Sequence, residues 1–218
     1  MRKLIFFFLF SAPAFPQLIS VGVKGGAPLT DPWQVFGAGS LRPQLSYGVR
    51  RYVVGPTAEV HLPLHLSFEV DALYRRTGFD AEGMAPDSLE REVRYFSRTA
   101  INNWEIPFLA KYTLGYGYGP IHPFVDGGYT YRHVSPAYDR ITTTVIATGE
   151  TTTQPLMTDF NNNTGGFTVG GGLSLKAGPL RLEPELRYTH WSSDAVPRES
   201  GLIESVSNQA DFLLGISF

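Results

Sequence analysis

The stretch that decides the fold is the last one in the chain, NQADFLLGISF, residues 208–218. Successive side chains of a β-strand point to opposite faces, so alternate residues sort into two rows. One row is apolar and aromatic: Phe212, Leu214, Ile216 and Phe218. The other row is small or acidic apart from one leucine: Asp211, Leu213, Gly215 and Ser217. The stretch therefore predicts an amphipathic strand that runs to the final residue.

The composition excludes several classes of protein. The chain has 218 residues, enough for one domain, and its formal net charge of -2 gives no electrostatic reason to expect nucleic acid as a partner. Charged residues make up 17% of the chain, below the average of about 25% for soluble proteins. There is no cysteine, which excludes a disulfide framework and a cysteine-ligated metal site. The five histidines have no metal-ligand spacing, so we expect neither a metal nor a cofactor.

The N-terminus predicts a secretory signal peptide. Arg2-Lys3 is positive, Leu4–Phe10 is an apolar run too short to span a membrane as a helix, and Ala12–Ala14 has the A-x-A form of a cleavage site. We expect residues 1–14 to be removed and residues 15–218 to form the mature domain. A secreted chain without long apolar helices can still cross a lipid bilayer as a closed barrel, because such a sheet satisfies its own backbone.

Eight segments show the period-two alternation of strands. They run over residues 18–26, 47–62, 65–77, 103–114, 121–134, 165–177, 180–191 and 208–218. The connections alternate between long and short, and the long ones cover residues 28–45, 78–100, 135–163 and 192–207, with 141–147 as a possible continuation of a strand. An even number of strands with short turns at one end and long loops at the other is typical of membrane barrels. The predicted fold class is all-β, an eight-stranded antiparallel up-and-down transmembrane β-barrel.

The second rows of these strands carry eight basic and eight acidic residues, which we predict to form an interior charge network. They are Lys24, Arg51, Arg75, Lys111, Arg132, Lys176, Arg181 and Arg187, and Glu59, Glu69, Asp71, Glu105, Asp126, Glu183, Glu185 and Asp211. A soluble barrel would instead expose this row and bury the apolar one. An eight-stranded barrel is just wide enough for side chains to fill it, so we expect a salt-bridged plug, with a narrow polar channel for small solutes as the alternative.

The aromatic residues favour the membrane barrel over the soluble one. With a periplasmic N-terminus, six rings fall toward the outer end of the apolar row: Tyr52, Tyr74, Trp104, Tyr129, Tyr131 and Tyr188. Two fall toward the periplasmic end: Tyr112 and Phe218. Rings at two levels form the girdles of a membrane barrel. Four prolines lie within the strands and predict bulges or local breaks, since each removes a ladder donor: Pro56, Pro107, Pro123 and Pro184.

The mature chain resembles the superfamily of small, OmpA-like outer-membrane β-barrels of Gram-negative bacteria. The resemblance rests on WEIPFLAKY (104–112), HPFVDGG (122–128), RYT (187–189) and the terminal Phe218. It implies a monomer in the cell outer membrane, whose partners are the membrane lipid and the barrel-assembly machinery that reads Phe218. It implies no single activity, because the superfamily holds structural, adhesive, transport and enzymatic members.

One constellation could carry chemistry at the outer end of the seventh strand. His190 and Ser192 continue the row predicted to face lipid, and Glu204 joins that row if the closing strand extends up to it. A serine activated by a histidine that a carboxylate orients can act as a nucleophile. The spacing is similar to that of outer-membrane lipid A deacylases, which implies Ser192 as nucleophile, His190 as base and Glu204 as orienting carboxylate.

The sequence departs from the deacylase pattern at two places. The family has asparagine where this chain has Ser193, and an Asn-Asp-Gly of the oxyanion hole where this chain has only Ser200-Gly201. His133-Val134-Ser135 repeats the His-x-Ser pattern without a matching glutamate. We therefore expect no enzymatic activity and a structural or surface-interaction role, with a deacylase-like esterase as the alternative.

Overall fold

The computed structural model describes residues 18–31, 33–35, 44–46, 51–87, 90–115, 119–135, 137–158, 163–192 and 203–218. The predicted signal peptide, residues 1–14, lies outside these ranges. The regular elements of the described ranges are all strands, and no helix there is long and apolar enough to cross a membrane.

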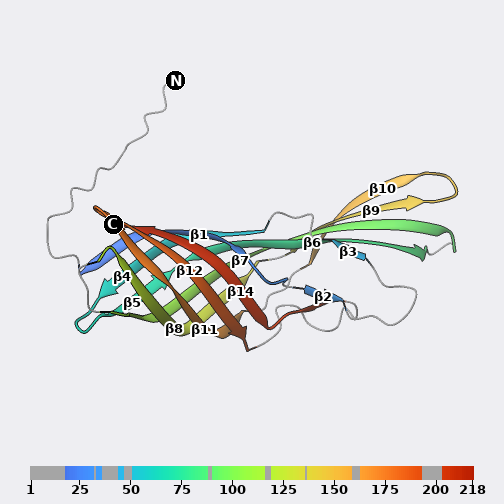
Figure 1. Ribbon diagram of the computed structural model, residues 1–218. Helices are drawn as coiled ribbons and strands as arrows, with labels where there is room; N and C mark the ends of the chain where they lie inside the picture. Colours follow the sequence, from blue (N-terminus) through green and yellow to red (C-terminus); the bar gives the residue numbers. More distant parts are fainter. Residues whose placement is uncertain are drawn as a thin grey trace, which may run out of the picture.

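Eight antiparallel strands close into a barrel (Figure 1). Around the wall they are β1 (Ile19–Pro28), β4 (Tyr52–His61), a third strand in two pieces, β5 (Leu66–Asp71) and β6 (Leu73–Pro86), then β7 (Glu92–Thr113), β8 (Ile121–Val134), β11 (Thr164–Ala177), β12 (Leu180–Trp191) and β14 (Asn208–Ser217). β14 then pairs with β1, from Gly22 opposite Ser217 to Pro28 opposite Asp211. The stretch that predicted the fold is therefore the strand that closes the barrel, and the predicted fold class is confirmed.

The segment 78–100, predicted to be a loop, is instead a long hairpin. β6 and β7 stay paired from Leu73 opposite Glu105 up to Pro86 opposite Glu92. β9 (Ala137–Val145) pairs with the upper part of β7, β10 (Thr151–Thr158) pairs with β9, and β3 (Gln44–Ser46) pairs with β6. We call this projecting part of the sheet the outer sheet; it leaves the barrel at the end opposite to the C-terminus (Figure 1).

The outer sheet also corrects the prediction for residues 135–163, of which only 141–147 were expected to form a strand. A separate small sheet joins β2 (Trp33–Val35) to β13 (Ile203–Ser205), in two further segments predicted to be loops. Strict alternation of apolar and polar residues is required only where one face meets lipid. Strands beyond that zone carry polar residues on both faces, so the sequence pattern does not distinguish them from loops.

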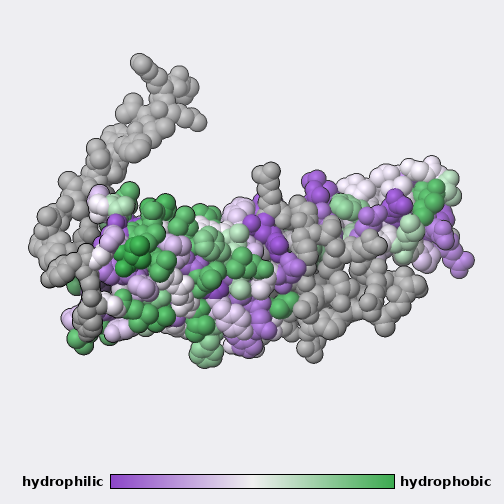
Figure 2. All heavy atoms as spheres, viewed as in Figure 1, coloured by the Kyte–Doolittle hydropathy of each residue, from purple (hydrophilic) through white to green (hydrophobic). Residues whose placement is uncertain are grey.

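The barrel wall has a charged inner face and an apolar outer face. Ion-pairing side chains such as Lys24 and Lys111, each 1% exposed, lie inside. Apolar side chains of the same strands point outward, with Phe108 53% and Leu186 59% exposed. Hydrophobic residues accordingly gather over the outside of the barrel, while the most hydrophilic ones lie largely toward the outer sheet (Figure 2). The inner and outer rows predicted from the sequence are those that the structure shows.

The predicted aromatic residues lie on the outside of the wall. Tyr52, Tyr74 and Trp104 form a continuous row, with ring centroids 6.2 and 5.5 Å apart. Tyr129 packs edge-on against Phe167 at 6.0 Å. The others are also exposed on this face: Tyr112, Tyr131, Tyr188 and Phe218.

Of the bulges or local breaks predicted at the four strand prolines, the structure shows local breaks and no shift of register. The register between β4 and the third strand is the same on both sides of Pro56, as Thr57 faces Asp71 and Val54 faces Tyr74. Ala72 N donates to Pro56 O at 3.0 Å, so only the reverse bond is missing. The result is a local break between β5 and β6. Registers likewise continue past the other three: Pro107, Pro123 and Pro184.

Candidate functional site

Two buried lysines hold together the half of the barrel interior that lies nearer the short turns. Lys111 Nζ lies 2.8 Å from Glu183, 3.2 Å from Glu69 and 3.4 Å from Glu59. Lys24 Nζ donates to Glu69 and, at 2.8 Å, to Glu185. Because each ammonium contacts carboxylates from several strands, these lysines cross-link the wall from within.

Two arginines complete the network. Arg187 contacts Glu185 at 2.5 Å, Asp71 at 2.9 Å and Glu69 at 3.1 Å. Arg75, nearer the outer end, binds both oxygens of Glu105 at 2.8 and 3.0 Å and both oxygens of Asp211 at 2.7 and 2.9 Å. Two-pronged contacts of this kind suit the planar guanidinium. The closing strand is therefore tied to the third and fourth strands of the wall through the lumen as well as to its neighbours.

Two of the sixteen predicted network residues lie elsewhere. The Arg51 side chain is 23% exposed and pairs with Asp31 at 2.8 Å, and Lys176 is exposed at the end with the short turns. By their place in the strand alternation both residues should point inward, as their neighbours do. Long basic side chains near a rim can nevertheless reach water. Eight predicted basic residues minus these two leave six against eight acidic ones, so the described interior has an acidic surplus of two.

Three carboxylates of the network have the composition of a cation site. Oxygen atoms of Glu59, Glu69 and Glu183 lie within 4.8 Å of one another. The ammonium group of Lys111 lies among them, within 3.4 Å of each, and also over the Phe124 ring at 4.3 Å. The chain thus supplies its own cation at this point, and a metal ion would have to displace it.

Several buried polar atoms of the interior have no hydrogen-bond partner. Among them are the acceptors Asp71 Oδ1, Asp126 Oδ1 and Glu183 Oε1 and two donors of Arg132, Nε and Nη2. The Arg132 guanidinium instead lies 3.3 Å from the centre of the Trp191 ring. Gly166 leaves room for that ring, because a Cβ there would be 2.9 Å from Trp191 Cε3. Unpaired groups of this kind mark places where interior water enters a network.

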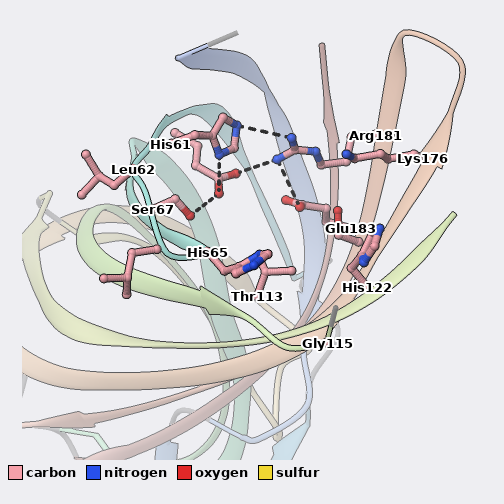
Figure 3. A pocket seen from close by; sticks show the side chains of 13 residues that line it. His61, Leu62, His65, Ser67, Thr113, Gly115, His122, Lys176, Arg181 and Glu183 are labelled. Carbon is pink, nitrogen blue, oxygen red and sulfur yellow. Dashed lines mark hydrogen bonds and ion pairs between the residues drawn. The ribbon is translucent and has the colours of Figure 1, made fainter. Parts of the chain in front are cut away.

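A cavity of about 530 Å³ opens at the end of the barrel that carries the short turns (Figure 3). We call it the vestibule. Three of the five histidines line it, namely His61, His65 and His122. Arg181 donates to Glu59 at 3.2 Å and lies 3.3 Å from His61 Nε2, which also contacts the Ser20 hydroxyl at 2.7 Å. Glu59 and Glu183 close the vestibule on the side of the charge network.

Sequence reasoning missed the vestibule because its residues come from strand ends far apart in the chain. His61 and His122 lie on β4 and β8, and His65 lies in the turn before β5. The register that pairs His122 with Ser174 is a property of the folded sheet. Only inward parity near a predicted short turn could have pointed to these histidines.

The structure gives His190 a partner other than the carboxylate proposed for the catalytic set. His190 is exposed at the outer end of β12, and its Nδ1 lies 2.9 Å from Asn208 Oδ1, which also accepts from the Tyr188 hydroxyl at 2.7 Å. Ser192 follows β12 and its backbone N donates to Gly165 O. Glu204 belongs to β13 and faces Gln34 of β2, so it does not continue β14; its side chain lies outside the described atoms. The group that orients His190 in this structure is an amide.

Outside the membrane-spanning strands, the outer sheet carries its own ion pairs. Arg98 donates to both oxygens of Asp80, at 2.9 and 3.1 Å. The hydrogen bond and the charge of this carboxylate raise the pKa of the Arg98 guanidinium. Arg91 pairs with Asp87 at 2.7 Å in the turn between β6 and β7.

Comparison with known proteins gives similarity to solved structures alone. No protein-family model matches the chain, and no curated protein matches it. One similar structure is neisserial surface protein A (NspA), with 14% identity and a TM-score of 0.42 over 91% of this chain and 94% of that one. Another is the outer membrane protein OprG from Pseudomonas aeruginosa, with 11% identity and a TM-score of 0.47 over 91% and 92%. At these values neither assigns a ligand or an activity to this chain.

Proposed function

We propose that this chain is an integral outer-membrane β-barrel protein with a structural or surface-interaction role and without enzymatic activity. One observation carries the proposal: the closed wall has its apolar row outside and its charged row inside. In water this arrangement would expose the apolar surface and bury the charges, both at a cost. In a bilayer the same wall satisfies its backbone internally and presents hydrocarbon to hydrocarbon.

We base the proposed cellular location on the predicted signal peptide and on Phe218. The predicted signal peptide directs export, and the aromatic Phe218, 60% exposed after β14, suits recognition by the barrel-assembly machinery. Lipid and this machinery are the partners we propose, and the interior cross-links require no second subunit. We therefore propose a monomer within its own membrane.

The simplest test of the membrane barrel is migration on a detergent gel. Folded barrels resist detergent at room temperature and unfold on boiling, so we expect the mature protein, residues 15–218, to shift its apparent mass when heated. It should also remain insoluble without detergent. The proposal would be contradicted if the protein were soluble in plain buffer and boiling did not change its mobility on the gel.

Esterase activity is the alternative function that deserves a direct experiment. His190 is hydrogen-bonded to Asn208, and an amide can hold a histidine tautomer, but it lacks the charge that stabilises an imidazolium. We expect lipid A from cells that express this protein to keep all its acyl chains. Mass spectrometry of that lipid A, with Ser192→Ala as the control, decides the point: an acyl chain lost only when Ser192 is present would make the protein a deacylase.

A further inference from the structure

β10 is the open edge of the outer sheet. It ends the strand order, after β9, and within the described part of the chain no strand pairs with its other side. Every residue from Thr151 to Leu156 is exposed. An uncovered edge presents unpaired backbone donors and acceptors and is a template for another strand.

The hydrogen bonds of the hairpin show which backbone groups are free. Val145 N donates to Glu150 O at 2.9 Å, so even-numbered residues of β10 point their N–H and C=O groups toward β9. The odd-numbered residues Thr151, Thr153 and Pro155 then point theirs to the open side. Thr151 and Thr153 offer a donor and an acceptor each, whereas Pro155 has no N–H to offer.

β10 lacks most of the features that protect edge strands. Its sequence, TTTQPLMT, has eight residues and no charge. Charged side chains, prolines and short lengths normally prevent pairing at an edge. Pro155 is the single such device here, and it stops pairing from extending beyond Thr153. An open segment with two complete residues remains at the tip of the outer sheet.

We propose that β10 pairs with β10 of a second copy of this chain, in an antiparallel arrangement between two facing membranes; the inference rests on the proposed function. A two-fold axis at Thr152 places Thr151 opposite Thr153 of the partner copy, and the reverse. All four N–H···O=C bonds of these two pairs can then form. The next pair would join Pro155 to Gly149, where the proline has no donor, so Pro155 selects this register.

The side chains on the outer face continue across this pairing. Thr142 and Thr153 hydroxyls lie 3.2 Å apart, as do those of Thr144 and Thr151. In the proposed register Thr151 and Thr153 of one copy face Thr153 and Thr151 of the other. Cross-strand threonine pairs of this kind stabilise sheets. The threonine array of one copy thereby becomes half of a larger array.

The direction of the strands decides where the partner is anchored. β10 and its neighbours project away from the barrel along the long dimension of the molecule (Figure 1). The two-fold axis of an antiparallel pair is perpendicular to its strands, so it reverses this direction and places the two barrels at opposite ends. Copies in one membrane would need parallel pairing, which is less stable per residue. The antiparallel pair therefore joins two surfaces, and many weak contacts add up when each membrane carries many copies.

The experiment uses the mature protein in phosphatidylcholine vesicles, in two populations that carry different dyes and different affinity tags. We expect the populations to cluster. Because the chain has no cysteine, Thr152→Cys provides one thiol per copy, opposite itself across the axis. Oxidation should give a disulfide dimer that carries both tags and forms only after the populations are mixed.

A matched pair of variants tests whether the edge is responsible. Thr153→Lys puts a charge on the open edge and should reduce clustering at least ten-fold. Met84→Lys puts the same charge on an exposed position of β6, in the cross-strand row of Thr151 but away from β10, and should leave clustering intact. The heat-induced gel shift of each variant reports the barrel separately: if it is absent in the unmodified chain, the proposed function fails. If it is present but clustering and mixed dimers are absent, or dimers form within one population alone, this inference is overturned.

Discussion

At the scale of single residues, the most consequential side chain is Lys111. Its ammonium group contacts three carboxylates from three strands, and the residue as a whole is 1% exposed. Burying any charge is unfavourable, and it is tolerated here because each charge has several partners. Lys176 has the same inward parity on another strand but ends in solvent. The two lysines are therefore a natural comparison.

We predict that Lys111→Met destabilises the folded barrel by about 3–5 kcal/mol, because three buried carboxylates lose their shared cation. Lys176→Met, the matched control, should leave stability unchanged. Urea unfolding in detergent, followed by tryptophan fluorescence, measures both. Equal midpoints for Lys111→Met and the unmodified chain would show that the network contributes little.

At the scale of elements, the seam between β1 and β14 depends on close backbone approach. A Cβ on Gly26 would lie 2.1 Å from Phe212 O and 2.8 Å from Leu213 Cδ2. Gly25, one residue earlier, points outward, and a Cβ there would be 3.8 Å from its nearest neighbour, Val53 O. The seam joins the first and last strands, so it forms only when the whole chain has assembled.

We predict that Gly26→Ala weakens this seam by about 1–3 kcal/mol, the usual cost of overpacking, whereas Gly25→Ala is tolerated. The fraction of heat-modifiable protein after refolding into detergent measures the difference. Similar yields for the two variants would mean that the seam relaxes to admit a methyl group.

The elements also show what the sequence could and could not predict. The segments 121–134 and 180–191 were predicted with the bounds of β8 and β12, because lipid on one face and charge on the other enforce strict alternation. Of the hairpin of β9 and β10, only residues 141–147 were predicted to form a strand, because polar residues lie on both faces there. The ion pairs of the network could not be predicted for another reason. Alternation along a strand predicts the face on which a side chain lies but not the residue with which it pairs, and Lys24 and Glu185 are 161 positions apart.

At the scale of the whole molecule, ion pairs cross the lumen and its acidic and basic groups are unequal in number. The described interior holds two more acidic than basic groups, and several of its carboxylate oxygens have no hydrogen-bond partner. The vestibule brings water to Glu59 and Glu183 from the end with the short turns. Beyond them, Lys24, Lys111 and Arg187 span the lumen between strands. We therefore expect these ion pairs to close the lumen, and the surplus of acidic groups to select cations if the ion pairs open.

We predict that the unmodified protein gives no stable ohmic steps in planar bilayers. Arg187→Gly removes a guanidinium that contacts three carboxylates and increases the acidic surplus to three, so it should admit water and produce small, cation-selective steps. Arg98→Gly changes the same residue type in the outer sheet and should give no conductance steps. Steps of equal size in all three proteins would show an open channel, and anion selectivity in the Arg187 variant would contradict the charge count, because a surplus of carboxylates repels anions from the lumen.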